Sequence, residues 1–437
     1  MLTYPISIRE PLIKAIENLG QEKWFKKPKD IPDSEMFQLF CDIAFHASFL
    51  TEEHRRPGFR VIYCNAEDLK LSQQVISGHF RIIRLHIPRP FTISELNRIA
   101  PAADLTRFLI CVYPQVNESK ILHIWGLLDT GERWWMFLHH DNSSGMPPPN
   151  FLTITSTAPG ELSFSLLGTI LLTLKNGALS YPSDMPVRYG PISDFLDESR
   201  QLLYKTIDEL KIKRIYFVGH ENDPEIDTHY SLFLESLLYN IRKLGHGGTV
   251  IVVPQEISFD DSRLTDRIAL KYTTDFDCVW DGLVQSLVTQ RRCWVVKFAE
   301  PHKDNVKLTL MELQEFHRLE EEYKQIDEEL RDVAKSIASL TAIDGAIVIT
   351  TQFKVLGFGG EIIATSPTLT SVTNTSNGQV IPLDSFGTRH RSAFRFCSSF
   401  EDSVAFIVSS DGGVKAVKRQ GSKLLFWPDI NEGLFGL

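Results

Sequence analysis

Apolar residues recur at helical spacing near the start of the chain. In residues 34–49, Met36, Phe37, Phe40 and Ile43 fall on one face, which predicts an amphipathic helix. Runs rich in branched and aromatic residues follow and predict strands at 59–64, 80–86, 108–113, 121–128 and 133–139. The proline run at 144–149 then predicts a loop or a joint between subdomains, because proline has no amide donor.

From residue 192 the pattern alternates between helix and strand. Helices are predicted at 192–210 and 230–244, and strands at 214–218 and 249–253, an order typical of βαβ units on a parallel sheet. Gly245, Gly247 and Gly248 separate the last helix from the last strand. We interpret them as the end of a helix and not as a phosphate loop, since no Lys-Ser/Thr pair follows.

A long charged helix is predicted over residues 309–340. Its apolar residues repeat every seven residues through four heptads. One heptad position holds Phe316, Tyr323, Leu330 and Ile337, and the other holds Leu319, Ile326, Val333 and Leu340. Such a stripe suits coiled-coil pairing, and it equally suits a single helix lying along a sheet or along the N-terminal domain.

After this helix the chain returns to strands, predicted at 343–350 and 355–364. The polar stretch 365–378 predicts a mobile loop. A short helix ending near residue 399 precedes three strands at 404–409, 414–418 and 423–427, with Asp411-Gly412 as a hairpin turn. The whole pattern predicts an α/β protein.

Composition narrows the class of protein. The 437 residues exceed what one hydrophobic core usually serves, so several domains are expected. A formal net charge of -9 disfavours broad nucleic-acid binding. The six scattered cysteines indicate reduced thiols, and neither a signal peptide nor an apolar stretch long enough to span a membrane is evident. We therefore expect a soluble, cytoplasmic protein.

The segment 387–393, GTRHRSA, carries the strongest chemical signal. Thr388 takes the position of a helix N-cap, which puts Arg389, His390 and Arg391 in the first helical turn. Cations are electrostatically unfavourable there, because free amides and the helix dipole already make that end positive. A bound anion such as phosphate would explain them, and a solvated basic patch is the alternative.

A second segment, Asp344-Gly345-Ala346, opens an apolar strand. A carboxylate at a strand end can hold a divalent metal ion, and two small residues after it allow a ligand to approach the backbone. A simple turn explains the same three residues.

Taken together, the DGA segment, the GTRHRSA segment and the closing hairpin resemble the diadenylate cyclase domain of bacteria. Leu356-Gly357-Phe358-Gly359 is similar to the form found in cyclases that carry an N-terminal sensor domain. The resemblance covers residues 308–437 and implies a mixed central sheet flanked by helices. It also implies one ATP per subunit, subunits that pair with catalytic domains face to face, and synthesis of the second messenger cyclic di-AMP.

Carried over by position, the resemblance implies a role for each residue. Asp344 would bind Mg²⁺ or Mn²⁺, and with Arg389 and His390 it would carry the catalytic roles. The ATP contacts would come from Gly345, Ala346, Leu356, Gly357, Phe358, Thr388, Arg389, His390, Arg391, Ser392 and Ser409. Arg391 could instead brace its loop by pairing with an acid.

One departure from the family concerns Ser409-Ser410-Asp411-Gly412, where better-known cyclases have Glu after the first serine. Asp411 either replaces that carboxylate or shapes the turn. Residues 1–300 resemble sensor regions that precede some cyclases, chiefly through 214–254, and their ligand is unknown. A non-catalytic nucleotide-binding module of the same fold is the alternative to a cyclase regulated by its N-terminal region.

Overall fold

The computed structural model describes sixteen stretches of the chain: 7–19, 31–51, 58–69, 81–105, 108–115, 118–129, 151–166, 169–175, 177–180, 186–187, 190–210, 224–298, 309–364, 369–409, 413–428 and 430. The chain divides into two compact units, residues 1–184 with 433–437, and residues 185–432. The predicted elements at 133–139, 144–149 and 214–218, and the turn at Ser410, Asp411 and Gly412, lie outside the described residues.

The first unit contains a mixed sheet in the order β2-β4-β3-β1-β5-β6-β7-β8. Its strands are β1 (Phe59–Tyr63), β2 (Arg81–Pro90), β3 (Phe108–Gln115), β4 (Glu118–Asp129), β5 (Thr153–Ser156), β6 (Leu162–Leu166), β7 (Thr169–Lys175) and β8 (Ala178–Ser180). Strands β1 and β3 are parallel, and the other neighbouring pairs are antiparallel. The four predicted strands that fall on described residues are confirmed, although β2 runs on to Pro90.

The helices of this unit are α1 (Arg9–Leu19), α2 (Ser34–Ala47), α3 (Ala66–Leu69), α4 (Ile93–Ile99) and the 3-10 turn η3 (Ala100–Ala102). The predicted helix at 34–49 is confirmed as α2. It begins at Asp33, whose carboxylate accepts a hydrogen bond from the Met36 amide at 2.9 Å. Its apolar face, including Phe37 and Phe40, is buried in the core of the unit.

The second unit is built on a ten-stranded mixed sheet in the order β10-β13-β12-β9-β16-β17-β18-β14-β15, with β11 also paired to β13. Its strands are β9 (Gly248–Val253), β10 (Ile268–Ala269), β11 (Tyr272–Phe276), β12 (Ala346–Thr350), β13 (Val355–Ile362), β14 (Ser371–Asn374), β15 (Val380–Pro382), β16 (Val404–Val408), β17 (Val414–Gln420) and β18 (Lys423–Trp427). Among the described pairs, only β9 with β12 and β14 with β18 are parallel. The parallel pairing predicted between 214–218 and 249–253 lies in part outside the described residues, and the described sheet is mixed, with most of its pairs antiparallel.

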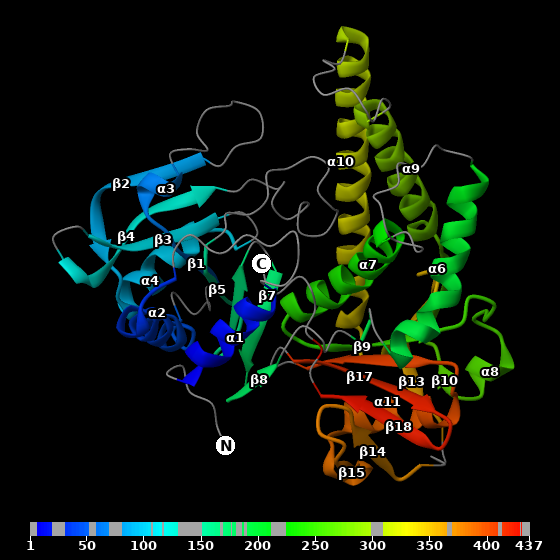
Figure 1. Cartoon of the computed structure of the whole chain (residues 1–437). Coiled ribbons are helices and arrows are strands. Elements are labelled where there is room, and N and C mark those ends of the chain that lie inside the picture. The colour runs from blue at the N-terminus through cyan, green and yellow to red at the C-terminus, as the bar shows by residue number, and fades with distance from the viewer. Residues whose placement is uncertain are drawn as a thin grey trace. The chain divides into compact units, whose positions relative to one another are not determined.

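Helices cover both faces of this sheet (Figure 1). One face carries α6 (Pro191–Glu209), α7 (Pro224–Lys243), α9 (Val279–Phe298) and α10 (Leu310–Ser339), and the other carries α11 (Thr388–Ser399). Because side chains alternate along a strand, Val250 and Ile347 face the four helices, while Ile251 and Ala346 face α11. Three short elements complete the unit: α8 (Ser262–Thr265), η5 (Leu340–Ala342) and η6 (Leu383–Ser385).

The predicted long helix is confirmed as α10, which begins with a capping box between Thr309 and Glu312. It packs on α7 and α9 of the same unit. Its stripe residues Leu319, Tyr323 and Ile337 are buried, and the Tyr323 hydroxyl lies 3.3 Å from Nε2 of His229. The heptad stripe thus packs within the second unit, along α7 and α9.

Two expectations differ from the structure. The domain limit expected at residue 308 falls inside the second unit, because β9 lies between β12 and β16 and shares their hydrogen bonds. The stretch 365–378 contains β14, which pairs with β15 and β18 and buries Val372, so it is not simply a loop. In both places long-range strand pairing outweighs the local composition.

All six cysteines are free thiols, in agreement with the reduced state expected. Burial raises the pKa of the Cys397 thiol on α11 to about 12, so that this thiol stays protonated. Cys397 belongs to the apolar core under α11, with Phe394 and Phe396.

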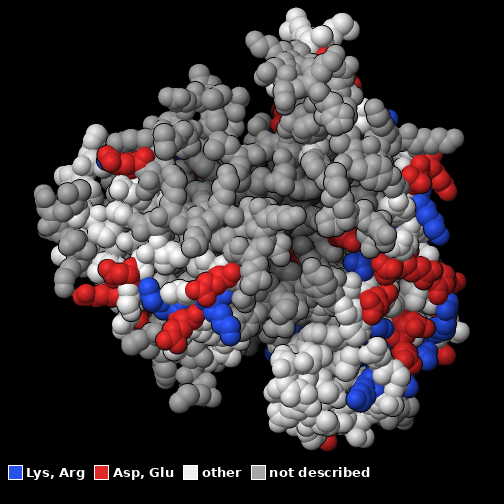
Figure 2. All heavy atoms as spheres, in the orientation of Figure 1, with Lys and Arg blue, Asp and Glu red and all other residues white. Residues whose placement is uncertain are grey.

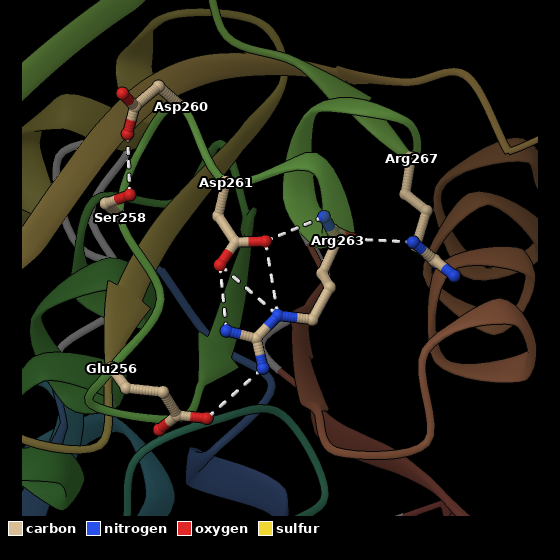
Figure 3. Close-up of polar contacts among 6 residues, drawn as sticks. All are labelled: Glu256, Ser258, Asp260, Asp261, Arg263 and Arg267. Atoms are coloured by element: carbon tan, nitrogen blue, oxygen red, sulfur yellow. Dashed lines mark hydrogen bonds and ion pairs between the residues drawn. The ribbon is translucent and has the colours of Figure 1, made fainter.

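The segment between β9 and β10 contacts the carboxyl end of α11 through Arg267. Figure 3 shows the polar contacts within this segment, among them those of Arg263 with Asp261, Glu256 and Arg267. Arg267 donates to the Ser399 carbonyl at 3.0 Å and to the Arg263 carbonyl at 2.7 Å, and its guanidinium lies over the Phe400 ring. A cation at this end of a helix also interacts favourably with the helix dipole. Arg263 itself pairs with Asp261 and Glu256 on the surface, and it lowers the pKa of the Asp261 carboxyl.

Replacing Arg267 should loosen α11. We expect Arg267→Gln to lower the free energy of unfolding by on the order of 1 to 2 kcal/mol, because it removes charged hydrogen bonds to two carbonyls. Arg263→Gln is the matched control and should change stability little, since its ion pairs are exposed. Urea unfolding of both variants measures the difference, and equal midpoints would contradict an anchoring role for Arg267.

Candidate functional site

The strand registers bring the two signature segments to one end of the sheet. Strands β9 and β12 are parallel, with Ala346 opposite Thr249, and β16 runs antiparallel to β9, with Val408 opposite Gly248. The end at which β9 and β12 begin is therefore the end at which β16 finishes. We call it the amino end of the sheet. Adjacent strands lie about 4.8 Å apart, so β12 and β16 are separated by roughly 10 Å.

Asp344 lies just before β12 at this amino end, and its side chain is exposed. Gly345 adopts φ = 127°, a conformation that a residue with a side chain rarely takes. A Cβ on Gly345 would come within 2.4 Å of the Gly359 carbonyl carbon. Ala346 is buried against the α11 side of the sheet. The DGA segment is thus a tightly constrained entry to β12, with its carboxylate turned to solvent.

The segment Leu356-Gly357-Phe358, in which the family resemblance implies contacts to the adenine of ATP, lies on β13, beside β12. Leu356 is buried in the core under α11, and Gly357 pairs with both Val348 and Thr273. Phe358 stacks on the half-exposed Tyr272 of β11, with ring centroids 4.9 Å apart. Of this aromatic pair only Tyr272 is exposed, because Phe358 is half-buried against the core on the four-helix side.

Helix α11 begins one residue earlier than expected. Gly387 is its N-cap and Thr388 its first helical residue, and the N-cap forms no side-chain hydrogen bond. A glycine cap leaves the first-turn amides of α11 without a capping side chain. Thr388 and Arg389 are exposed, and Ser392 is half-buried.

Arg389 connects α11 to the amino end of the sheet. Its guanidinium donates to the Val408 carbonyl at 3.4 Å, next to Ser409. The Ser409 hydroxyl accepts a hydrogen bond from the Lys415 ammonium at 3.3 Å, and the Ser409 amide donates to the Gly413 carbonyl across the hairpin. Asp344, Arg389 and Ser409, which are widely separated in sequence, thus all belong to the amino end.

His390 and Arg391 are placed differently from Arg389. The His390 ring packs against the rings of Phe386 and Phe394, at centroid distances of 5.9 Å and 6.2 Å. Arg391 is half-buried, and no acidic side chain of the described stretches forms an ion pair with it. The bracing ion pair considered for Arg391 is therefore absent from this part of the chain.

Sequence reasoning missed Lys415. Val414 and Ala416 on β17 face the four-helix side, whereas Val417 faces α11, so Lys415 lies on the α11 side. The period-two pattern of β17 was the signal that could have placed this cation beside the GTRHRSA segment.

Asp344 is the one carboxylate assigned to a metal, and among the described residues no group of three or more His, Cys, Asp or Glu could hold a metal ion. An exposed single carboxylate fits Mg²⁺, which commonly binds one or two carboxylates together with substrate phosphates. The donor set is thus compatible with a metal that arrives with its nucleotide.

Charge is mixed on the face of the molecule drawn in Figure 2. The acidic and basic side chains that are coloured there lie beside one another, and they form no broad area of a single sign among the residues shown in colour. Two cations lie at the amino end of the sheet. Arg389 contacts the Val408 carbonyl, and Lys415 contacts the Ser409 hydroxyl.

Comparison with known proteins identifies one part of the chain. Residues 26–129 match a family model described as a probable sensor domain, DACNV. This confirms a sensor-like region at the N-terminus, and places it in the first unit. The stretch 214–254 that suggested it contains β9, a central strand of the second unit. The stretch 214–254, on which the resemblance to a sensor region chiefly rested, therefore belongs to the second unit, whereas the family match lies in the first.

Two solved structures are similar at low identity. DacA from Staphylococcus aureus, solved as a double cysteine mutant, is 15% identical over 47% of this chain and 90% of its own, with a TM-score of 0.24. A hypothetical membrane spanning protein from Bacillus cereus is 13% identical over 54% of this chain and 95% of its own, with a TM-score of 0.23. No curated protein matches the chain. Within the described stretches, no helix has the length and apolar character needed to cross a membrane.

The close packing at Gly345 gives a test of the DGA segment. We expect Gly345→Ala to lower the free energy of unfolding by more than about 1 kcal/mol, because alanine resists this φ and its Cβ would collide with the β13 backbone. Gly387→Ala is the control, since φ there is -67° and a Cβ would meet nothing within 4 Å. Thermal unfolding of both variants checks this, and equal losses would contradict it.

Proposed function

We propose that the second unit is a diadenylate cyclase, which condenses two ATP into cyclic di-AMP and two pyrophosphates. The observation that carries the proposal is the register of β12, β9 and β16, because it brings Asp344 and the contact between Arg389 and the Val408 carbonyl to one end of one sheet. A carboxylate before β12 and a cation at the end of β16, on strands roughly 10 Å apart, suit a nucleoside triphosphate, which presents a ribose and a chain of anionic phosphates.

The reaction assigns a task to each part of the site. The 3′-oxygen of one ATP attacks the α-phosphorus of the other, the bond from that phosphorus to the bridging oxygen breaks, and pyrophosphate leaves with the electron pair. The hydroxyl proton passes to solvent, and a second such transfer closes the ring. A bound Mg²⁺ or Mn²⁺ would lower the pKa of the hydroxyl.

In this proposal Asp344 holds the metal ion, and Gly345 and Ala346 line the ribose. Arg389 and Ser409 bind phosphate, together with Thr388, His390, Arg391 and Ser392 from the start of α11. Leu356, Gly357 and Phe358 are assigned to adenine, as the family resemblance implies. Phe358 is half-buried, stacks on Tyr272 and packs against the core on the four-helix side of the sheet. Each copy of the second unit binds one ATP, so the second units of two chains must face each other.

We further propose that the first unit, which contains the probable sensor region, regulates synthesis by binding a ligand. We propose the long helix α10 as the route of this control. Since α10 packs on α7 and α9, a signal that reaches it would act by shifting these helices over the sheet.

The direct test is product analysis. The full chain is incubated with ATP and Mg²⁺ or Mn²⁺, and the products are identified by mass spectrometry. Cyclic di-AMP and pyrophosphate in a ratio of one to two support the cyclase. Tight ATP binding without product would instead support the regulatory module, for which Ser410 in place of the family's Glu is the favouring observation.

Asp344→Asn tests the metal role. We expect turnover to fall by about 100-fold or more, since the metal-bound carboxylate is lost, while ATP binding changes little. Initial rates and calorimetric ATP binding provide the two measurements. A variant with near-normal turnover would show that Asp344 does not hold the metal.

Arg389→Ala tests the phosphate role of the start of α11. We expect ATP affinity to fall by about 10- to 100-fold, because a hydrogen bond from a cation to a phosphate contributes roughly 1.5 to 3 kcal/mol. Arg395→Ala, one and a half turns further along the same helix, removes the same charge and should leave affinity nearly unchanged. Equal affinities for the Arg389 variant and the wild type would remove Arg389 from the site.

A further inference from the structure

Lys415 is a cation that no feature of the family resemblance assigns to the site. It lies on β17 directly after Val414, which pairs with Val408 at the end of β16. Its side chain lies on the α11 face of the sheet, and its ammonium donates to the Ser409 hydroxyl at 3.3 Å. It is half-buried, so its position is defined by its neighbours.

Two cations from different elements therefore meet at the end of β16. Arg389 reaches the Val408 carbonyl from α11, and Lys415 reaches the next residue, Ser409, from β17. Successive residues of a strand lie about 3.3 Å apart, so these contact points are close neighbours. Two neighbouring cations repel each other. An anion bound between them would attract both and so offset that repulsion.

The described residues supply no such anion. No carboxylate of the described stretches lies within ion-pair distance of Arg389 or Lys415, although surface arginines elsewhere in the unit, such as Arg263 and Arg318, are paired. A Lys that serves only to support the fold would commonly pair with an acid or extend into solvent. Lys415 instead donates to a neutral hydroxyl.

We propose that Lys415 and Arg389 clamp the β- and γ-phosphates of ATP, with the Ser409 hydroxyl between them. The proposal rests on the proposed function, and it deepens it by naming the residue that receives the departing pyrophosphate. Negative charge accumulates on this group as the bond to the α-phosphorus breaks, and a fixed ammonium stabilises that charge. Lys is suited to this as a compact point charge, whereas Arg binds in a fork.

The clamp makes a prediction that does not require turnover. Calorimetry measures binding of inorganic pyrophosphate, of ATP and of adenosine to the full chain. Lys415→Gln should weaken pyrophosphate and ATP by about tenfold and leave adenosine unchanged, and Lys415→Arg should retain most of the affinity. Lys423→Gln removes the same charge from an exposed position on β18 and is the control.

The outcomes separate the two proposals. If cyclic di-AMP is made and Lys415→Gln binds pyrophosphate like the wild type, the clamp is wrong and the cyclase stands. If no cyclic di-AMP is made but Lys415→Gln alone loses pyrophosphate affinity, the clamp is right and the cyclase is wrong. Equal losses in the Lys415 and Lys423 variants would show a general effect of charge and overturn the clamp.

Discussion

The structure depends on the hydrogen-bond register of three central strands. Strand β9 pairs in parallel with β12 and antiparallel with β16, so one row of backbone hydrogen bonds fixes where the DGA segment and the closing hairpin meet. A shift of one residue would turn every side chain of a strand to the opposite face. Because both faces carry buried aliphatic side chains, such a shift would leave Val250 and Ile251 in each other's place under the wrong helices.

Packing then limits how far the site can deform. Gly345 lies against the β13 backbone, and Gly248 lies against the side chain of Thr341 at the end of α10. At the carboxyl end of α11, Arg267 donates to the Ser399 carbonyl and so connects that end of the helix to the segment between β9 and β10. A site that combines groups from β12, α11 and the β16–β17 hairpin needs such constraint, since its polar contacts are few and partly exposed.

Local sequence patterns predicted the helices and strands more accurately than they predicted which strands pair with one another. The heptads of α10, the amphipathic α2 and the strands β16, β17 and β18 follow directly from periodicity, and the structure confirms them. The domain limit was placed too late because nothing local shows that β9 pairs with strands about a hundred residues away. Lys415 was not singled out for the same reason, since only the strand pairing shows which face of β17 it occupies and that it contacts Ser409. Asp344 and Arg389 could be selected from their unfavourable local chemistry, but only the registers bring them to one end.

The most direct test of this account is the position of a bound nucleotide. A crystal structure of the full chain with a non-hydrolysable ATP analogue and Mn²⁺ would locate both the phosphates and, by anomalous scattering, the metal. The account predicts Mn²⁺ at the Asp344 carboxylate and the terminal phosphates beside Ser409, between Arg389 and Lys415. A nucleotide bound in the first unit, or at the opposite end of the sheet, would contradict it.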